Sequence, residues 1–218
     1  MRYESPGYGA RADPAPVLPT SVKVVIAGGF GVGKTTFVGA ISEIDPLTTE
    51  AAMTDAAAHL DDQAGVEAKT TTTVALDFGR ITVDDSIVLY LFGTPGQERF
   101  VFLWDDLTEG ALGAIVLVDT RRIDACYVAV DYFERRGIPF VVAVNPFDSA
   151  EMFELDEVRE ALDLPAHVPI VSSDARDRGA AKAALITLLE FVLVRLPPAA
   201  GYLPPAAGIA YPPPAGGR

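Results

Sequence analysis

The sequence has one cysteine and no apolar run long enough to cross a membrane. Cys126 alone excludes an intrachain disulfide and is typical of a reducing compartment. A membrane-spanning helix needs about 20 consecutive apolar residues, and the N-terminus has no apolar segment of the signal-peptide kind. The two histidines, His59 and His167, have no partners at metal-ligand spacing and receive no role. These absences predict a cytoplasmic protein.

Positive charge is also scarce. The 17 Lys and Arg residues face 30 Asp and Glu residues, which gives a net charge of −13. Affinity for nucleic acid comes largely from basic side chains that neutralise phosphates, so neither DNA nor RNA is an expected partner. An anionic membrane surface would repel the chain as well, so membrane association is expected only through partner proteins.

Proline, glycine and alanine gather at both ends of the chain. Residues 1–20 and 197–218 show no apolar periodicity, and the second segment contains an imperfect LPPAAG repeat. Such a composition buries too little apolar surface to offset the entropy of the chain. We predict two disordered tails around one domain at residues 21–196. For the C-terminal tail, an inert extension and a docking peptide both remain open.

Between the tails, short β-branched runs alternate with helical patterns. Strands are predicted at 22–28, 73–83, 86–93, 113–119, 139–145 and 169–173, and helices at 34–43, 123–136, 151–162 and 177–195. Strands that are apolar throughout are typical of a sheet covered on both faces. The predicted fold is therefore α/β, with a mostly parallel six-stranded sheet, one antiparallel strand from the first hairpin, and helices on both faces. Cys126 is expected in its core.

The segment GGFGVGKT at residues 28–35 matches the pattern GxxxxGK[ST], directly after a predicted strand and at the start of a predicted helix. This is the context of a phosphate-binding P-loop, because the glycines let backbone N–H groups converge on an anion and the helix N-terminus adds positive potential. Lys34 is predicted to reach the β- and γ-phosphates, and the Thr35 hydroxyl to bind Mg²⁺. A P-loop by itself permits ATPases, nucleotide kinases and GTPases.

Three further segments bear on the choice between these classes: TTTVALDFG at 71–79, LFGTPGQERF at 91–100 and VNPFD at 144–148. With them the chain resembles the Ras-like GTPase superfamily over about residues 20–195. Within that superfamily it looks most like the conservon-type (Cvn) bacterial GTPases and, more distantly, the gliding-motility MglA group. The resemblance implies a P-loop domain that binds GTP and GDP with Mg²⁺.

The segment NPFD stands where this superfamily has NKxD. The resemblance implies that Asp148 accepts the two adjacent N–H donors of guanine, a pair that adenine does not offer, and that Asn145 bridges the base and the phosphate loop. An unpaired buried carboxylate costs about 1–3 kcal/mol, which favours guanine. Pro146 replaces the usual lysine and can still pack on a flat base. The other reading is a strand that simply ends in an Asn-Pro turn.

The segment SDAR at 173–176 aligns with the superfamily's SAK segment through Asp174, Ala175 and Arg176. By resemblance, the Ala175 backbone N–H would meet guanine O6. The residues expected to contact the nucleotide are Gly28, Gly29, Phe30, Gly31, Val32, Gly33, Lys34, Thr35, Thr36, Gly96, Asn145, Asp148, Asp174, Ala175 and Arg176.

The tract TVALDF resembles the TxGxDF tract of switch I. The resemblance makes Thr73 the second Mg²⁺ hydroxyl, with Thr72 as the alternative, so the expected metal ligands are Thr35 and Thr73. The backbone N–H of Thr73 would meet the γ-phosphate, and the loop would loosen when that phosphate is lost. The path of the acidic stretch 43–69 is not readable from the sequence.

The tract GTPGQE resembles switch II, where the family pattern is DxxGQE. By resemblance, the Gly96 N–H would meet the γ-phosphate and Gln97 would orient the attacking water, so Gln97, Thr73 and Lys34 are the expected catalytic residues. Gly93 stands where the family has its Mg²⁺-side aspartate, a substitution that the conservon-type and gliding-motility groups share. Arg99 is either an arginine supplied in cis or a surface residue.

The leading hypothesis is a GTP-binding molecular switch that hydrolyses GTP to GDP and phosphate and signals through residues 60–78 and 93–108. The run FVFLW at 100–104 either gives the second segment an apolar partner surface or packs inside. An alternative is a hydrolysis-deficient guanine-nucleotide-binding interaction module, which Gly93 favours. A nucleotide or metabolite kinase would need an acceptor pocket and a basic lid. By resemblance, the expected partners are GTPase-regulating proteins, namely Roadblock-type dimers and a sensor-kinase-like protein.

Overall fold

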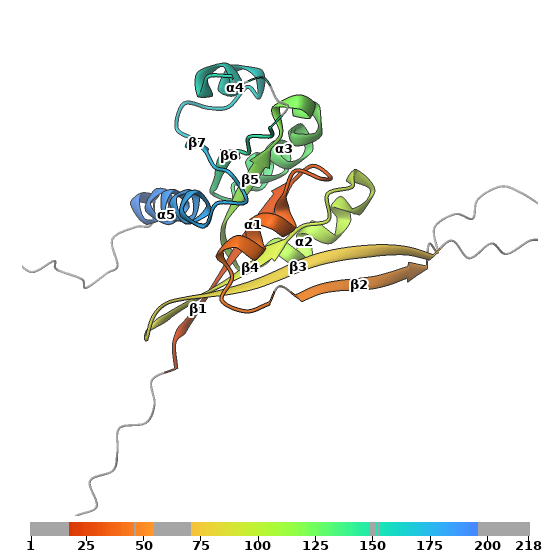
Figure 1. Cartoon of the computed structure of the whole chain (residues 1–218), viewed down its shortest axis with the longest axis vertical. Helices are drawn as coiled ribbons and strands as arrows, with labels where there is room; N and C mark the ends of the chain where they lie inside the picture. The colour runs from red at the N-terminus through yellow and green to blue at the C-terminus, as the bar shows by residue number, and fades with distance from the viewer. Residues whose placement is uncertain (1–17, 46, 55–70, 149–150, 152, 196–218) are drawn as a thin grey trace, which may run out of the picture.

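A computed structural model describes residues 18–45, 47–54, 71–148, 151 and 153–195. The two predicted tails therefore lie almost entirely outside the described residues, as does most of the acidic stretch 43–69. The described part contains a seven-stranded sheet in the order β2-β3-β4-β1-β5-β6-β7 (Figure 1).

The strands are β1 (Thr20–Gly28), β2 (Leu47–Thr54), β3 (Thr71–Asp84), β4 (Ile87–Gly93), β5 (Ala111–Val118), β6 (Phe140–Val144) and β7 (Ile170–Ser172). β3 pairs antiparallel with both β2 and β4, and the other pairings are parallel. Among the described strands, β3 is thus the one that is antiparallel to the others. All six predicted strands form, which confirms a mostly parallel α/β sheet with one antiparallel strand.

β2 is a seventh strand that the sequence does not predict. Its residues, LTTEAAMT, lack the alternation of apolar and polar side chains by which a half-covered strand is recognised. It pairs with β3 from Leu47 opposite Phe78 to Thr54 opposite Thr71. β4 pairs with β3 only from Asp77 onward. The β2–β3 hairpin therefore continues beyond the end of β4 (Figure 1).

The helices are α1 (Lys34–Ile41), η1 (Glu98–Leu103), α2 (Trp104–Thr108), η2 (Thr120–Cys126), α3 (Tyr127–Arg136), α4 (Leu155–Ala161) and α5 (Arg178–Arg195), where η marks a 3₁₀ helix. The predicted helix 123–136 is two elements, the end of the 3₁₀ helix η2 and the α-helix α3, which begins at Tyr127. The predicted helix 151–162 begins at Leu155, where the Glu154 N–H donates to the Glu157 carboxylate at 2.9 Å.

The core lies on both faces of the sheet. Along β1, Val24 and Ile26 belong to a buried cluster with α1 and α5, whereas Val25 and Ala27 belong to a second cluster with α2, α3 and α4. The alternation follows from the two-residue period of a strand, and it confirms helices on both faces. Cys126 is buried in the second cluster, as predicted. No helix within the described ranges combines the length and apolarity that crossing a membrane requires.

Candidate nucleotide-binding site

The phosphate loop connects β1 to α1 at the carboxyl edge of the sheet, where ligands of open α/β sheets bind. Gly28, Gly31 and Gly33 all have positive φ, a backbone conformation that side chains with a Cβ rarely adopt. At Gly33 the space is closed as well, since a Cβ there would lie 2.8 Å from the Asn145 Nδ2 atom. The sequence therefore folds into a loop that only glycines permit, followed by the open N–H groups of a helix start.

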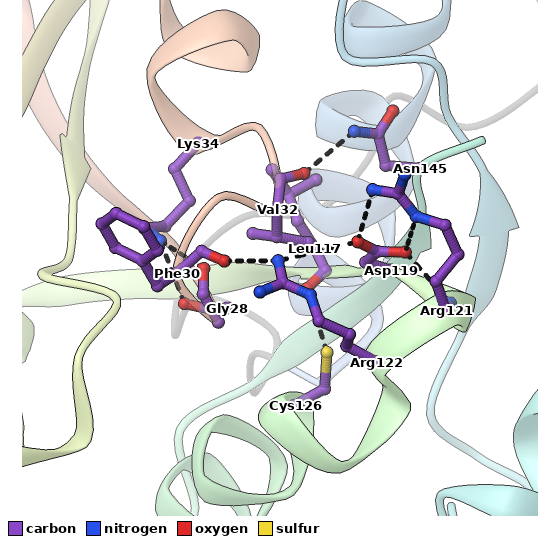
Figure 2. A network of polar contacts seen from close by, with 11 residues as sticks. Gly28, Phe30, Val32, Lys34, Leu117, Asp119, Arg121, Arg122, Cys126 and Asn145 are labelled. Carbon is purple, nitrogen blue, oxygen red and sulfur yellow. Dashed lines mark hydrogen bonds and ion pairs between the residues drawn. The ribbon is translucent and has the colours of Figure 1, made fainter. Parts of the chain in front are cut away.

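Lys34 is buried beneath this loop. Its Nζ atom donates to the carbonyl oxygens of Gly28 at 3.0 Å and Gly29 at 2.8 Å (Figure 2). Burial lowers the pKa of Lys34 from 10.5 to about 8, and the nearby charge of Asp77 partly opposes that shift. A polyphosphate in the loop would add negative charge beside this ammonium group and favour its protonated form.

Asp77 on β3 is the main site residue to which sequence reasoning gave no role. The Thr35 hydroxyl donates to its Oδ2 atom at 2.8 Å. Asp77 lies directly opposite Gly93 in the β3–β4 register, and a Cβ at Gly93 would stand 2.9 Å from the Asp77 Cβ. The Asp77 carboxylate therefore occupies the space next to Gly93, where the superfamily's aspartate was expected. A buried acid opposite a glycine across a predicted hairpin is the signal that could have revealed it.

Thr94 adds an oxygen to the same place. Its hydroxyl is buried and has no hydrogen-bond partner among the described residues, a situation that is uncommon in folded proteins. It lines a pocket of about 340 Å³ whose other walls are the phosphate loop, Asp77 and Gly96. The Thr35 hydroxyl and the Asp77 carboxylate, which are 2.8 Å apart, suit a hard cation such as Mg²⁺, which takes one or two protein ligands together with phosphates and water.

Thr73 is the expected second Mg²⁺ hydroxyl. Its backbone belongs to β3, where it pairs with Ala52 on β2. Four residues of extended strand separate it from Asp77, a span of about 13 Å. Its side chain, like that of Thr72, lies outside the described part of the molecule. The metal-binding role of Thr73 stays a prediction.

The segment at residues 93–100 that resembles switch II, and keeps that label below, lies directly against the phosphate loop at Gly96. A Cβ at Gly96 would stand 2.6 Å from the Lys34 Nζ and 2.8 Å from the Phe30 Cα, so only glycine allows this approach. The buried Trp104 anchors the turn, because its indole Nε1 donates to the Pro95 carbonyl at 3.2 Å. Gln97 is half-buried at the N-cap of η1, next to Gly96 in the chain.

Arg99 is exposed on η1, with its guanidinium 4.9 Å from the centre of the Phe100 ring. This position agrees with the surface reading of Arg99 rather than with an arginine at the phosphates. For the apolar run at 100–104 the sequence left two alternatives, packing inside the domain or a surface for partners, and each applies to some of its residues. Phe100 and Trp104 are buried, whereas Phe102 is 59% exposed.

Asn145, at the end of β6, connects the phosphate loop to the 173–176 segment. Its Nδ2 donates to the Val32 carbonyl at 2.9 Å (Figure 2), and its Oδ1 accepts from the Ala175 N–H at 2.9 Å. The structure thus brings together three segments that the sequence predicted to meet at the nucleotide. The Ala175 N–H, expected to reach guanine O6, already has this partner and would have to be shared with a base.

Asp148, the expected guanine-reading carboxylate, pairs with Arg176. The Arg176 Nη2 lies 3.2 Å from the Asp148 Oδ1 and 2.9 Å from the Asp174 Oδ2. The hydrogen bonds from Arg176 hold the pKa of Asp174 below its usual value. The Asp148 side chain is 86% exposed, and ion pairs at such positions contribute at most about 1 kcal/mol. A base with better donors can therefore displace Arg176 from Asp148.

The fold and the phosphate loop together define a P-loop protein with the architecture of a GTPase domain. Residues 26–194 match the profile of a family described as "conserved hypothetical ATP binding protein". The match spans most of the chain, and the protein belongs to this family. An uncharacterized protein of Methanocaldococcus jannaschii is 31% identical over 134 residues, which are 60% of this chain and 73% of the relative.

Solved structures with the same fold include G-domains of the iron transporter FeoB. The G-domain from Methanococcus jannaschii has 15% identity and a TM-score of 0.53, and the match covers 79% of this chain and 98% of that one. The GDP-bound cytosolic domain from T. maritima has 17% identity and a TM-score of 0.56, and covers 80% of this chain. Our chain spans 64% of that domain. At such identities the likeness establishes the fold, and the resemblance to conservon-type GTPases stays a prediction.

Proposed function

We propose that this protein is a guanine-nucleotide switch that binds GTP and GDP with Mg²⁺ and hydrolyses GTP to GDP and phosphate. The observation that carries the proposal is the Asn145 link, which joins a complete phosphate loop to the loop bearing Asp148. A nucleotide on the phosphate loop would thus place its base near a carboxylate that can accept from guanine N1–H and the 2-amino group. Adenine offers no such pair of donors.

In this proposal the phosphates lie along the N–H groups of residues 29–35, and the Lys34 ammonium neutralises charge on the β- and γ-phosphates. Thr35 and Asp77 would hold Mg²⁺, which neutralises the charge that develops on the phosphates during hydrolysis. Asp77 here takes the part that the superfamily pattern assigns to position 93. Thr73 would add its hydroxyl only after switch I rearranges.

Hydrolysis is assigned to switch II. The Gly96 N–H would donate to the γ-phosphate, since the glycine already lies against Lys34 and Phe30. Gln97, the next residue, would orient the attacking water. The alternative, a binding module without hydrolysis, rests on Gly93. Asp77 weakens that alternative, because its carboxylate lies next to Gly93, where the superfamily pattern has an aspartate.

The choice of base has a second candidate, adenine, because the family description names ATP and because Arg176 partly neutralises Asp148. The test is competition against fluorescent mant-GDP by GTP, ATP and XTP, on protein first freed of nucleotide. We expect ATP to compete at least about a hundredfold less well than GTP, a difference of roughly 3 kcal/mol. D148N should move the preference from GTP toward XTP, and D131N, an exposed aspartate of α3, serves as the control. Equal competition by ATP and GTP would make this an adenine-nucleotide protein.

Roadblock-type dimers and a sensor-kinase-like protein remain the proposed partners. The support from the described residues is the exposed Phe102 on η1, next to the switch II turn, since a large exposed aromatic side chain suits a protein interface. Membrane association would come through these partners. Pull-down of GDP-loaded and GTP-loaded protein, with F102A as the matched variant, tests whether binding depends on both the nucleotide and this side chain.

A further inference from the structure

Asp119 is a buried carboxylate at the end of β5 that the nucleotide-binding assignments above do not use. It is 2% exposed, and it accepts from the Arg121 backbone N–H at 3.0 Å and from the Arg121 Nε and Nη2 atoms at 2.9 Å each. The Arg122 Nη2 lies 3.8 Å from its Oδ2. These bonds, those from the Arg121 side chain first, hold the pKa of Asp119 below its usual value.

Arg121 extends from Asp119 to the base-reading loop. Its guanidinium lies 3.8 Å from the centre of the Phe147 ring, a distance that gives a favourable cation–π contact. Phe147 stands between Asn145 and Asp148 in the sequence. The position of its ring therefore bears directly on where the Asp148 carboxylate lies.

Arg122 extends to the phosphate loop. Its Nη2 donates to the Phe30 carbonyl at 2.7 Å (Figure 2), and the same atom lies 3.3 Å from the point where a Cβ of Gly31 would stand. The backbone at Arg122 has φ −145° and ψ 58°, which breaks η2. Without that break, the geometry of a 3₁₀ helix would send successive side chains about 120° apart rather than letting both serve one carboxylate.

The strand order explains why a residue on β5 can reach both loops. β5 lies between β1, which leads into the phosphate loop, and β6, which leads into the base-reading loop. A ligand that must contact both loops binds more tightly when the two are already held in the right relation, because less conformational freedom is lost on binding. The Asn145 side chain provides one such link, and Asp119 with its two arginines provides another.

We propose that Asp119, Arg121 and Arg122, together called the Asp119 bridge, are positioning residues that hold the base-reading loop and the phosphate loop in register for one nucleotide. The inference rests on the proposed function and deepens it. It also offers an account of Pro146. This residue cannot make the contacts of the usual lysine, and in this chain the two arginines of the bridge connect the same pair of loops from the neighbouring strand.

The proposal predicts that the two arginines affect different parts of binding: Arg121 the selectivity for the base, and Arg122 the affinity for the phosphates. R121A frees the Phe147 ring, so the affinity ratio of GDP to IDP, which lacks the 2-amino group, should fall by about tenfold, as expected for the loss of a charge-assisted contact. Its affinity for inorganic tripolyphosphate, which contacts only the phosphate loop, should stay unchanged. R122A should lower tripolyphosphate affinity and leave the GDP to IDP ratio near the wild-type value. R121K, which keeps the charge but not the planar guanidinium, should behave as R121A.

D119N tests the connection itself, because it should produce both losses, and adding R121A or R122A to it should change little further. The matched controls are D131N and R135A, which break an exposed ion pair of 3.1 Å on α3 away from both loops. All affinities are measured by isothermal titration calorimetry on the full chain. A merely structural role for Asp119 would lower the affinities for all three ligands in proportion and leave the GDP to IDP ratio unchanged.

The outcomes separate the two claims. Wild-type protein that binds neither GDP nor GTP overturns the proposed function and the bridge with it. Wild-type protein that binds GDP, with R121A and R122A both at the wild-type ratio and tripolyphosphate affinity, overturns the bridge alone. These two arginines are partly exposed, with 38% and 52% of their side-chain surface accessible. Their variants therefore decide the matter even where D119N fails to fold.

Discussion

Asp77 and Gly93 face each other across the β3–β4 pair, and the Asp77 Oδ2 lies 3.0 Å from where a Cβ of residue 93 would stand. The two positions therefore have room for one carboxylate side chain between them. In this chain the carboxylate is on β3, where it accepts from the Thr35 hydroxyl. The effect of having glycine rather than aspartate at position 93 therefore depends on the residue opposite to it on β3.

Replacing Asp77 should weaken the Mg²⁺ dependence of nucleotide binding. D77A removes either a metal ligand or the group that orients Thr35, so Mg²⁺-dependent GDP affinity should fall by about tenfold or more. G93D alone should also fail, because the new Cβ would lie 2.9 Å from the Asp77 Cβ. The double variant D77G/G93D should recover part of the loss. Magnesium titrations of mant-GDP binding measure all three, and an unaltered magnesium dependence in D77A would exclude the assignment.

Lys34 should make the nucleotide-free protein more stable as the pH rises. Its pKa is about 8 in the folded state against 10.5 for the ordinary group, so between these values the unfolded chain binds more protons than the folded one. By linkage, the free energy of unfolding then increases with pH across this window, by at most about 3 kcal/mol. Urea titrations from pH 7 to 10 should show the increase in wild type and in K182M, whose lysine is exposed, but not in K34M.

The same lysine should make nucleotide binding weaken above about pH 8, because Lys34 of the nucleotide-free protein loses its proton there, whereas the phosphates favour the protonated ammonium group. K34A should lose nucleotide retention at every pH. The measurement is mant-GDP dissociation between pH 7 and 9. Retention of mant-GDP by K34A at the wild-type level would refute the phosphate-loop assignment.

Trp104 should report the position of switch II. It is the one tryptophan of the sequence, it is buried, and its indole donates to Pro95 in the switch II turn. G96A puts a Cβ 2.8 Å from the backbone of Phe30, so the turn must move away from the phosphate loop. We expect a red-shifted Trp104 emission in G96A and weaker GTP binding. G179A is the control, since at Gly179 only the end of the Asp177 side chain is close. An unchanged spectrum in G96A would show that the turn is not held by this contact.

Gln97 should affect turnover more than binding. Q97L removes the group that orients the attacking water, so the single-turnover rate of GTP hydrolysis should fall by about tenfold or more while GDP affinity changes little. E98Q is the control, because it alters the exposed neighbouring residue. Phosphate release from [γ-³²P]GTP is measured with and without candidate partners. Hydrolysis by Q97L at the parental rate would remove the role, and no release by wild type under any condition would favour the binding module.

Parts of this site that depend on local sequence could be predicted. The phosphate loop is one continuous segment with its glycines at fixed spacing, and Asn145 directly ends a strand that is apolar throughout. Both lie where the sequence indicates. The fold follows for the same reason, since the period of apolar residues in each segment decides which faces are buried. Only the short or polar elements, β2 and η1 among them, escape such patterns.

The residues that sequence reasoning missed depend on pairing between distant segments. The role of Asp77 depends on the residue opposite to it on β4, and that of Asp119 depends on Arg121 and Arg122, which both lie beside it because the helical geometry of η2 breaks at Arg122. In the sequence, Asp119 is simply the polar residue that ends an apolar strand. For Thr73 the tract matches a switch pattern, its backbone lies in β3, and its expected role stays a prediction.

Because Asp77 lies on β3, this strand contributes to two parts of the proposed site. One continuous strand carries the carboxylate next to the phosphate loop and, four residues earlier, the threonine expected to respond to the γ-phosphate. Because side chains alternate along a strand, a shift of β3 by a single residue would turn Asp77 away from Thr35 and reverse the faces of the whole expected switch. In the proposed switch, such a shift would release Mg²⁺ and change the surface offered to the proposed partners at the same time.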